Sequence, residues 1–212
     1  MKAFKAMLGL AAVGVGLWAG AARAQFGLPI VESYEGRETG ILDFTAGATF
    51  SEENRFYGLR DTISVLEDFR LFIDLGLADI ERNDENLAVQ GGFIWCLPLD
   101  TPPVDLGLRG SAYWFNGDVD EISGYTAMLM ASGNPVFEGL YVYGGLGFDY
   151  RTTETDLIAL GLEQPGKTEK SDDKIRAVTA LGALMPVTER FWIFAEALVN
   201  DDPYIAVGIR TR

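Results

Sequence analysis

The chain has 212 residues, with 31 acidic and 17 basic side chains and no histidine, which gives a formal net charge of -14. Nucleic acid is not expected as a partner, because binding to phosphates needs a basic stripe that this composition does not supply. The lack of histidine excludes Ser-His-Asp and Cys-His nucleophile pairs and HExxH zinc sites, and the single cysteine, Cys96, cannot form an intrachain disulfide. The length fits one domain.

The first 24 residues have the layout of a secretory signal peptide. Lys2 and Lys5 precede an apolar run over residues 7–19, and small residues end the segment at Ala22-Arg23-Ala24. The run is shorter than the roughly 20 apolar residues that a transmembrane helix needs. We therefore expect cleavage before Gln25. No later apolar stretch approaches that length, so a mature chain that spans a membrane must do so as a closed barrel.

The mature chain alternates apolar and polar residues. Residues 25–38 form a leader that contains Gly, Pro and Glu, and residues 39–212 follow in short segments separated by polar turns. In residues 69–79, the leucine and isoleucine side chains at 71, 73, 75 and 77 share one face of a strand, and Arg70 and Asp74 share the other. This period of two predicts antiparallel strands that pair with their neighbours along the chain.

The pattern predicts an all-β, antiparallel up-and-down barrel of about ten strands, with eight as the alternative number. The expected strands are residues 39–50, 55–65, 69–80, 86–98, 104–116, 121–132, 139–153, 173–186, 190–199 and 203–210. The one long connection is residues 154–173, with an apolar centre at 157–162 that fits a short helix. Counting along the chain places this loop on the same rim as the acidic turns, which are residues 51–54, 81–85, 117–120 and 200–202. The remaining turns are all short and lie on the opposite rim, at residues 66–68, 99–103, 133–138 and 187–189.

Aromatic residues gather near the expected strand ends, as in the interfacial girdles of membrane barrels. Toward the rim of the long loop we expect Phe50, Tyr57, Trp114, Phe115, Phe148, Tyr150 and Tyr204, and toward the other rim Phe69, Trp95, Tyr141, Phe191 and Trp192. Phe44, Phe72, Tyr143 and Phe194 do not fit this arrangement.

Charged residues occupy the less apolar strand faces. If the barrel spans a membrane they point into the lumen, because charge that faces lipid is costly. These residues are Asp43, Arg60, Arg70, Asp74, Asp105, Arg109, Arg151, Arg176 and Glu196. They could line a narrow polar channel. We favour a lumen filled by paired side chains, since barrels of eight strands are just filled and ten strands add little room.

The remaining motifs assign no catalytic, metal or cofactor residue. Acidic clusters such as Asp118/Asp120/Glu121 lack EF-hand spacing and are interpreted as solvated turns. The glycine run at 144–147 lacks the lysine and helix of a phosphate loop, and is interpreted as easing strand curvature. Cys96 is interpreted as a packed thiol.

Taken together, the signal peptide and the alternating strands, such as residues 143–150 and 186–192, resemble the small bacterial outer-membrane β-barrel proteins of the porin-like and opacity-protein group. The resemblance covers nearly the whole mature chain. It implies a non-enzymatic protein of the bacterial outer membrane with a structural, surface-contact or narrow-pore role. The implied partners are outer-membrane lipids, the barrel insertion machinery and a surface ligand at loop 154–173, with no cofactor.

An alternative is a soluble periplasmic or secreted barrel that binds an apolar small molecule inside. Alternation alone cannot separate the two hypotheses, because turning every strand inside out leaves the period unchanged. The feature that separates them is which face of the barrel is continuously apolar around the ring.

Overall fold

The computed structural model describes residues 39–51, 54–80, 83–98, 104–133, 139–156, 169–199 and 203–211. They form the strands β1 (Leu42–Phe50), β2 (Asn54–Ser64), β3 (Phe69–Ile80), β4 (Asn83–Leu97), β5 (Val104–Asn116), β6 (Asp120–Gly133), β7 (Tyr141–Asp156), β8 (Glu169–Pro186), β9 (Phe191–Val199) and β10 (Tyr204–Thr211). Among these residues no helix is long and apolar enough to cross a membrane. The predicted signal peptide, the leader and the apolar centre at 157–162 lie outside the described residues.

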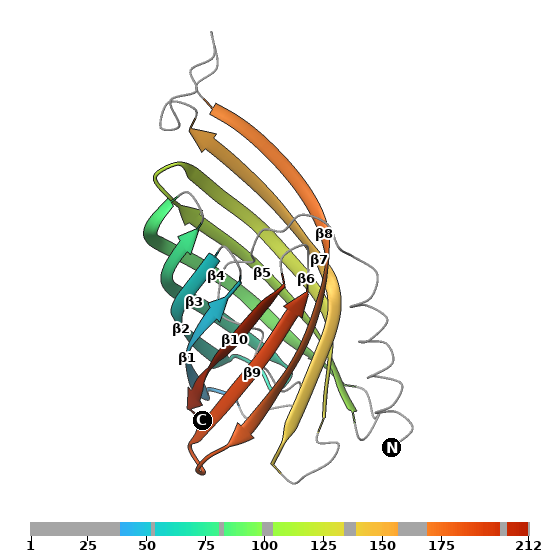
Figure 1. Ribbon diagram of the computed structural model, residues 1–212. Coiled ribbons are helices and arrows are strands. Elements are labelled where there is room, and N and C mark those ends of the chain that lie inside the picture. The colour runs from blue at the N-terminus through green and yellow to red at the C-terminus, as the bar shows by residue number, and fades with distance from the viewer. Residues whose placement is uncertain are drawn as a thin grey trace.

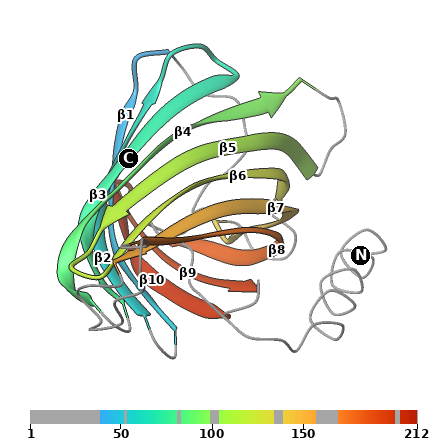
Figure 2. The same ribbon diagram turned by 90° about the horizontal axis from the view of Figure 1, so that it is seen from above.

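The strands close into an antiparallel barrel. Each strand pairs with its neighbours along the chain, and β1 pairs with β10 from Thr45–Arg210 to Phe50–Ile205 (Figures 1 and 2). The expected up-and-down barrel of ten strands is confirmed, and the alternative of eight is wrong. Short hairpin turns explain this topology, since antiparallel neighbours need only a few connecting residues.

The expected loop at 154–173 is partly wrong. Strands β7 and β8 continue their pairing past Thr152–Asp173 as far as Asp156–Glu169. The flanks of the loop are therefore strand, and only residues 157–168 remain between them. The β-branched residues Thr152, Thr153 and Thr155 favour this extension, although the charged residues around them look like a loop in the sequence. Figure 1 shows β7 and β8 rising beyond the other strands.

The exterior of the barrel is largely apolar on all ten strands, although Asp61 on β2 lies exposed between Leu59 and Ile63. Large apolar or aromatic side chains are at least about a third exposed on every strand, including Phe44 on β1, Leu75 on β3, Leu129 on β6 and Ile205 on β10. A barrel surrounded by water would carry polar residues on this face. Of the two faces of the barrel, the outer one is thus the more continuously apolar.

The interior holds two buried apolar clusters. One lies mainly on β6 to β10 and includes Met130, Tyr143 and Phe194. The other lies toward the rim of the acidic turns and includes Phe56 and Phe115. Phe115 and Tyr204 are buried inside, so their expected place in an outer girdle is wrong.

Tyr141 and Trp192 also differ from the expected girdle. They pack against the inner cluster of β6 to β10, with their ring centroids 5.5 Å apart. Their positions near strand ends are as expected, but the alternation of side chains along each strand directs these two residues inward.

Candidate functional site

A row of buried polar side chains crosses the inner wall of the barrel. By cross-strand register, Arg210 faces Thr45, Thr45 faces Arg60, Arg60 faces Asp74 and Asp74 faces Gln90. Beyond Gln90 the row continues through Ser111, Thr126, Asp149 and Arg176. We call these nine residues, on nine of the ten strands, the polar ladder. Because barrel strands tilt relative to the barrel axis, the polar ladder winds around the lumen as a spiral.

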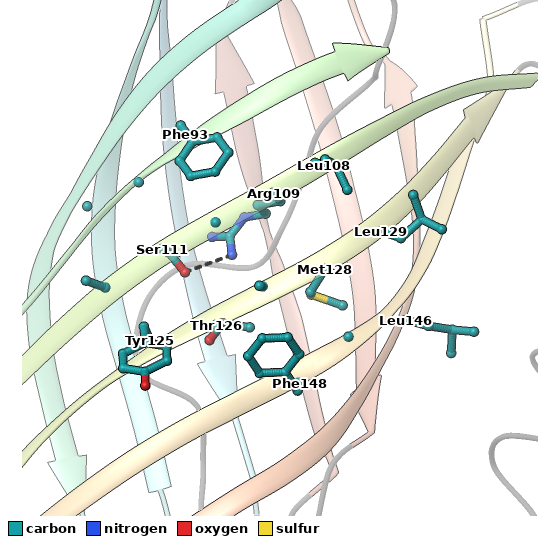
Figure 3. Close-up of a pocket in the computed structure, with 16 residues that line it drawn as sticks. Phe93, Leu108, Arg109, Ser111, Tyr125, Thr126, Met128, Leu129, Leu146 and Phe148 are labelled. Atoms are coloured by element: carbon teal, nitrogen blue, oxygen red, sulfur yellow. Dashed lines mark hydrogen bonds between the residues drawn. The ribbon is translucent and has the colours of Figure 1, made fainter. Parts of the chain in front are cut away.

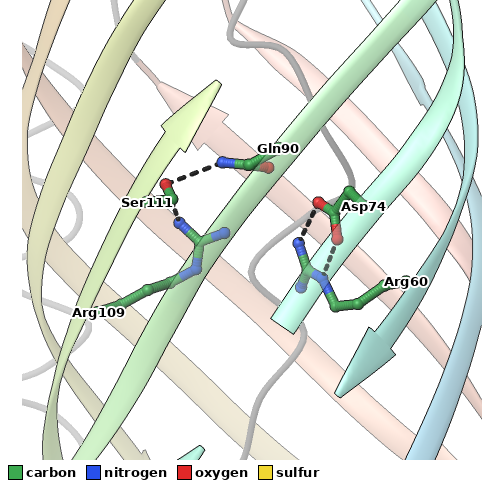
Figure 4. Close-up of polar contacts among 5 residues, drawn as sticks. All are labelled: Arg60, Asp74, Gln90, Arg109 and Ser111. Atoms are coloured by element: carbon green, nitrogen blue, oxygen red, sulfur yellow. Dashed lines mark hydrogen bonds and ion pairs between the residues drawn. The ribbon is translucent and has the colours of Figure 1, made fainter. Parts of the chain in front are cut away.

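The strongest contact in the polar ladder joins β2 and β3. The Arg60 guanidinium donates Nε to Asp74 Oδ1 at 2.6 Å and Nη2 to Asp74 Oδ2 at 2.7 Å, and both side chains are fully buried (Figure 4). Such bidentate pairing matches the planar fork of arginine to the carboxylate. Each charge is thereby paired in a place without water, where an unpaired charge would destabilise the folded barrel.

Phe72 lies between two arginines. Arg60 and Arg109 each place their guanidinium carbon 4.6 Å from the centroid of the Phe72 ring. The ring face attracts cations, so it stabilises two like charges that would otherwise repel each other. This sandwich links β2, β3 and β5 along one side of the lumen.

Ser111 connects β4 with β5. Its hydroxyl oxygen accepts a hydrogen bond from Gln90 Nε2 at 2.8 Å and another from Arg109 Nη1 at 3.1 Å (Figure 4). The bond to Gln90 carries the polar ladder from β4 to β5, although the two residues are not direct partners in the register.

Asp149 is the acceptor on the opposite wall. Its carboxylate accepts hydrogen bonds from the Thr126 hydroxyl at 2.8 Å and from the Tyr113 hydroxyl at 3.0 and 3.1 Å. Two neutral donors therefore stabilise a carboxylate that is completely buried.

Two further contacts complete the network. Tyr143 on β7 donates its hydroxyl to Glu196 on β9 at 2.7 Å. Arg210 on β10 contacts Asp43 on β1 at 2.6 Å, beside the seam where the barrel closes. This ion pair connects the first and last strands through side chains as well as through the backbone.

Glycines on the inner wall let long side chains reach over a strand. Tyr143 passes over Gly182 on β8 to reach Glu196, and Tyr113 passes over Gly124 on β6 to reach Asp149. A Cβ added at either glycine would overlap the tyrosine above it. Similarly, Met130 and Met128 cover Gly145 and Gly147. The glycine run at 144–147 therefore makes room for neighbouring side chains, a reason that the sequence did not reveal.

The structure places the predicted lumen charges as follows. Asp43, Arg60, Arg70, Asp74, Arg109, Arg151, Arg176 and Glu196 are buried, and Asp105 is half-buried. Sequence reasoning missed Asp120, Asp149 and Arg210, which are buried too. Parity could have found two of them, since Asp149 shares a face with Arg151, and Arg210 lies opposite Val207 and Ile209.

The lumen is close to electrically balanced. The described residues include six buried arginines and five buried carboxylates, so the acidic excess of the whole chain lies elsewhere. The carboxylates of Asp74, Asp149 and Glu196 all accept hydrogen bonds from neighbouring side chains. These hydrogen bonds hold strands together from inside the barrel.

No family model matches the chain, and no curated protein matches it. Among solved structures, the chain is similar to the KdgM porin (10% identity, 80% of this chain and 98% of that chain, TM-score 0.43). It is also similar to the N-terminal β-barrel domain of Pseudomonas aeruginosa OprF (12%, 80% and 95%, 0.39). A third similar structure is Ail, the attachment invasion locus protein of Yersinia pestis (11%, 80% and 91%, 0.33). The closed antiparallel barrel of ten strands confirms the predicted resemblance to bacterial outer-membrane barrels as far as the fold is concerned.

We predict that Asp74→Ala destabilises the barrel by about 3–5 kcal/mol, because it leaves the Arg60 charge buried without its carboxylate. Urea unfolding in phosphatidylcholine vesicles measures the change. The control, Glu67→Ala in the exposed turn between β2 and β3, should change stability by no more than about 0.5 kcal/mol. Equal behaviour of the two variants would show that the ion pair contributes little.

We predict that Gly182→Ala destabilises the barrel by about 2 kcal/mol or more, because the new methyl group displaces Tyr143 and weakens its bond to Glu196. The matched control is Gly91→Ala on the outer face, where an added Cβ meets nothing closer than 3.7 Å. The same unfolding assay compares them. If Gly91→Ala costs as much as Gly182→Ala, the loss reflects strand glycines in general and not the crossing of Tyr143.

Proposed function

We propose that this protein is a β-barrel of the bacterial outer membrane, closed by its own side chains, with a non-enzymatic structural and surface-contact role. The observation that carries this proposal is the combination of an apolar exterior on every strand with a buried network of paired charges inside. Lipid is the environment in which that exterior is stable, since a closed barrel leaves no unpaired backbone edge in the hydrocarbon.

The alternative of a soluble barrel around an apolar ligand fits less well. Such a barrel needs a polar exterior and an empty apolar cavity. Here the exterior is apolar, and the apolar side chains inside pack against one another.

A closed lumen is favoured over a narrow pore. Arg60, Arg70, Arg109 and Arg151 are each at most 2% exposed, whereas residues that line a water-filled channel are wetted. The guanidinium groups of Arg60 and Arg109 meet on the Phe72 ring inside the barrel. Side chains that fill the lumen in this way block the passage of solutes.

The tall hairpin of β7 and β8 supports the surface-contact role. Among the described strands, β9 pairs with β8 only from Thr179 to Pro186, so β8 extends alone beyond it on that side. The extended part carries exposed Ser171, Asp172, Asp173 and Lys174. Charged residues on a strand edge suit contact with a polar partner and oppose uncontrolled pairing. Orientation with this hairpin outside the cell follows the arrangement of short turns on the periplasmic rim.

The partners of this role are outer-membrane lipids, the barrel insertion machinery and a surface ligand at the β7–β8 connection. Export by the N-terminal signal peptide is part of the same proposal.

A planar bilayer experiment tests the closed lumen. We expect the purified, inserted barrel to give no sustained conductance steps, because packed side chains fill its interior. The double variant Phe72→Ala, Arg109→Ala removes the sandwich and should conduct more than the wild type. Long-lived, uniform openings of the wild-type barrel would contradict the closed lumen.

Epitope insertion tests the orientation. A tag inserted after residue 162, between β7 and β8, should bind antibody on intact cells. The same tag inserted after residue 188, in the turn between β8 and β9, should bind only after the outer membrane is permeabilised. The reverse pattern would show that the hairpin faces the periplasm.

A further inference from the structure

The outer wall of the barrel has a hollow of about 680 Å³ on β4 to β7. Its floor includes the small residues Gly91, Ala112 and Ala127, and the Phe93 ring lies over a fourth, Gly110. Around them stand Phe93, Leu108, Tyr125, Leu129, Leu146 and Phe148 (Figure 3). No charged group belongs to the outer face of the hollow, since Arg109 lies on the inner face of the same wall.

Cross-strand register gathers the small residues into one place. Gly91 pairs with Ala112, and Gly110 pairs with Ala127. The outer face of β3 carries leucine and isoleucine at the four positions 71, 73, 75 and 77 and has no such gap. At Gly91 an added Cβ would meet only ordinary contacts, so packing within the barrel does not require glycine there.

A second hollow, of about 190 Å³, lies beside the first and reaches β8. The two share Leu129 and Leu146, and the second adds Leu106, Ala131 and Gly144 to the lining. Together they form an apolar depression from β4 to β8, which we call the outer groove. The side chains around it are mainly leucine and aromatic, which suits a hydrocarbon chain.

We propose that the outer groove binds one acyl chain of a membrane lipid, an inference that rests on the proposed outer-membrane function. The groove is continuous with the apolar exterior that faces the hydrocarbon, so acyl chains are the molecules present at its mouth. Tyr125, stacked on Tyr150 at a centroid distance of 4.9 Å, stands at the end of the groove nearest the β7–β8 rim. Tyrosine favours the headgroup level, which places the polar end of the lipid there and its chain along the groove.

A second copy of the barrel fits the groove less well. A two-fold symmetric dimer would place the same face of each barrel against the other. If the two-fold axis passed through the groove, two hollows would meet and leave a void, which forfeits packing contacts. A flexible acyl chain fills the concave surface without this cost.

The test measures binding of dimyristoyl phosphatidylcholine to the detergent-solubilised, refolded barrel by native mass spectrometry. The variant Ala127→Phe fills the floor of the groove, and Ala195→Phe places the same ring on the exposed outer face of β9, outside it. We expect the wild type and Ala195→Phe to retain one lipid, and Ala127→Phe to bind it about tenfold more weakly. A tenfold loss corresponds to contact with roughly two methylene groups. Ala112→Leu is a second filling variant in case Ala127→Phe does not fold.

Two outcomes overturn the inference in different ways. If all variants bind lipid equally, the outer groove is no binding site, although the barrel can still be a membrane protein. Insertion of each variant into phosphatidylcholine vesicles is therefore measured in parallel, by migration of unboiled and boiled samples. If the wild type does not insert, the proposed function and the acyl-chain site both fail.

Discussion

The antiparallel pairing of β1 with β10 is the constraint on which the rest of the structure depends. It closes the sheet, so that the first and last strands present no open row of backbone donors and acceptors where they pair. Closure also divides the side chains into an inner and an outer set, because successive residues on a strand point to opposite faces. The Arg210–Asp43 ion pair beside this seam stabilises the closure from within.

The polar and charged side chains of the inner set need hydrogen-bond or ionic partners within the small volume of the lumen. Arginine meets this demand by pairing with carboxylates and by lying over an aromatic ring, as Arg60 does with Asp74 and Phe72. Glycine contributes differently. Because it has no side chain, a tyrosine can pass over it and form a hydrogen bond to the strand beyond. Crossings of this kind connect strands that share no backbone hydrogen bonds, and they make the filled lumen part of the framework of the barrel.

Much of the fold could be predicted from the sequence, because alternation is a local signal. The leucine and isoleucine residues of β3 identify its outer face without knowledge of any partner strand. The ends of β7 and β8 could not be predicted in the same way, since charged residues such as Asp172 and Asp173 look like a loop until their pairing is known. The direction of Phe115 and Tyr204 was also missed, because an aromatic residue near a strand end is compatible with either face.

The candidate site also combines features that the sequence predicts with features that depend on the pairing of strands. Alternation along the strands pointed to charged residues such as Arg60 and Asp74, which are buried, but it missed Asp149 and gave none of the partners, which depend on register between strands. The bond between Tyr113 and Asp149 joins residues 36 positions apart, and it needs glycine at position 124 on the strand between them.

The most direct test of the account is fractionation of cells that express the full-length chain, with gel migration of unboiled and boiled samples. The account predicts recovery in the outer membrane and a band that shifts on boiling. Recovery as a soluble periplasmic protein, with no shift, would contradict it.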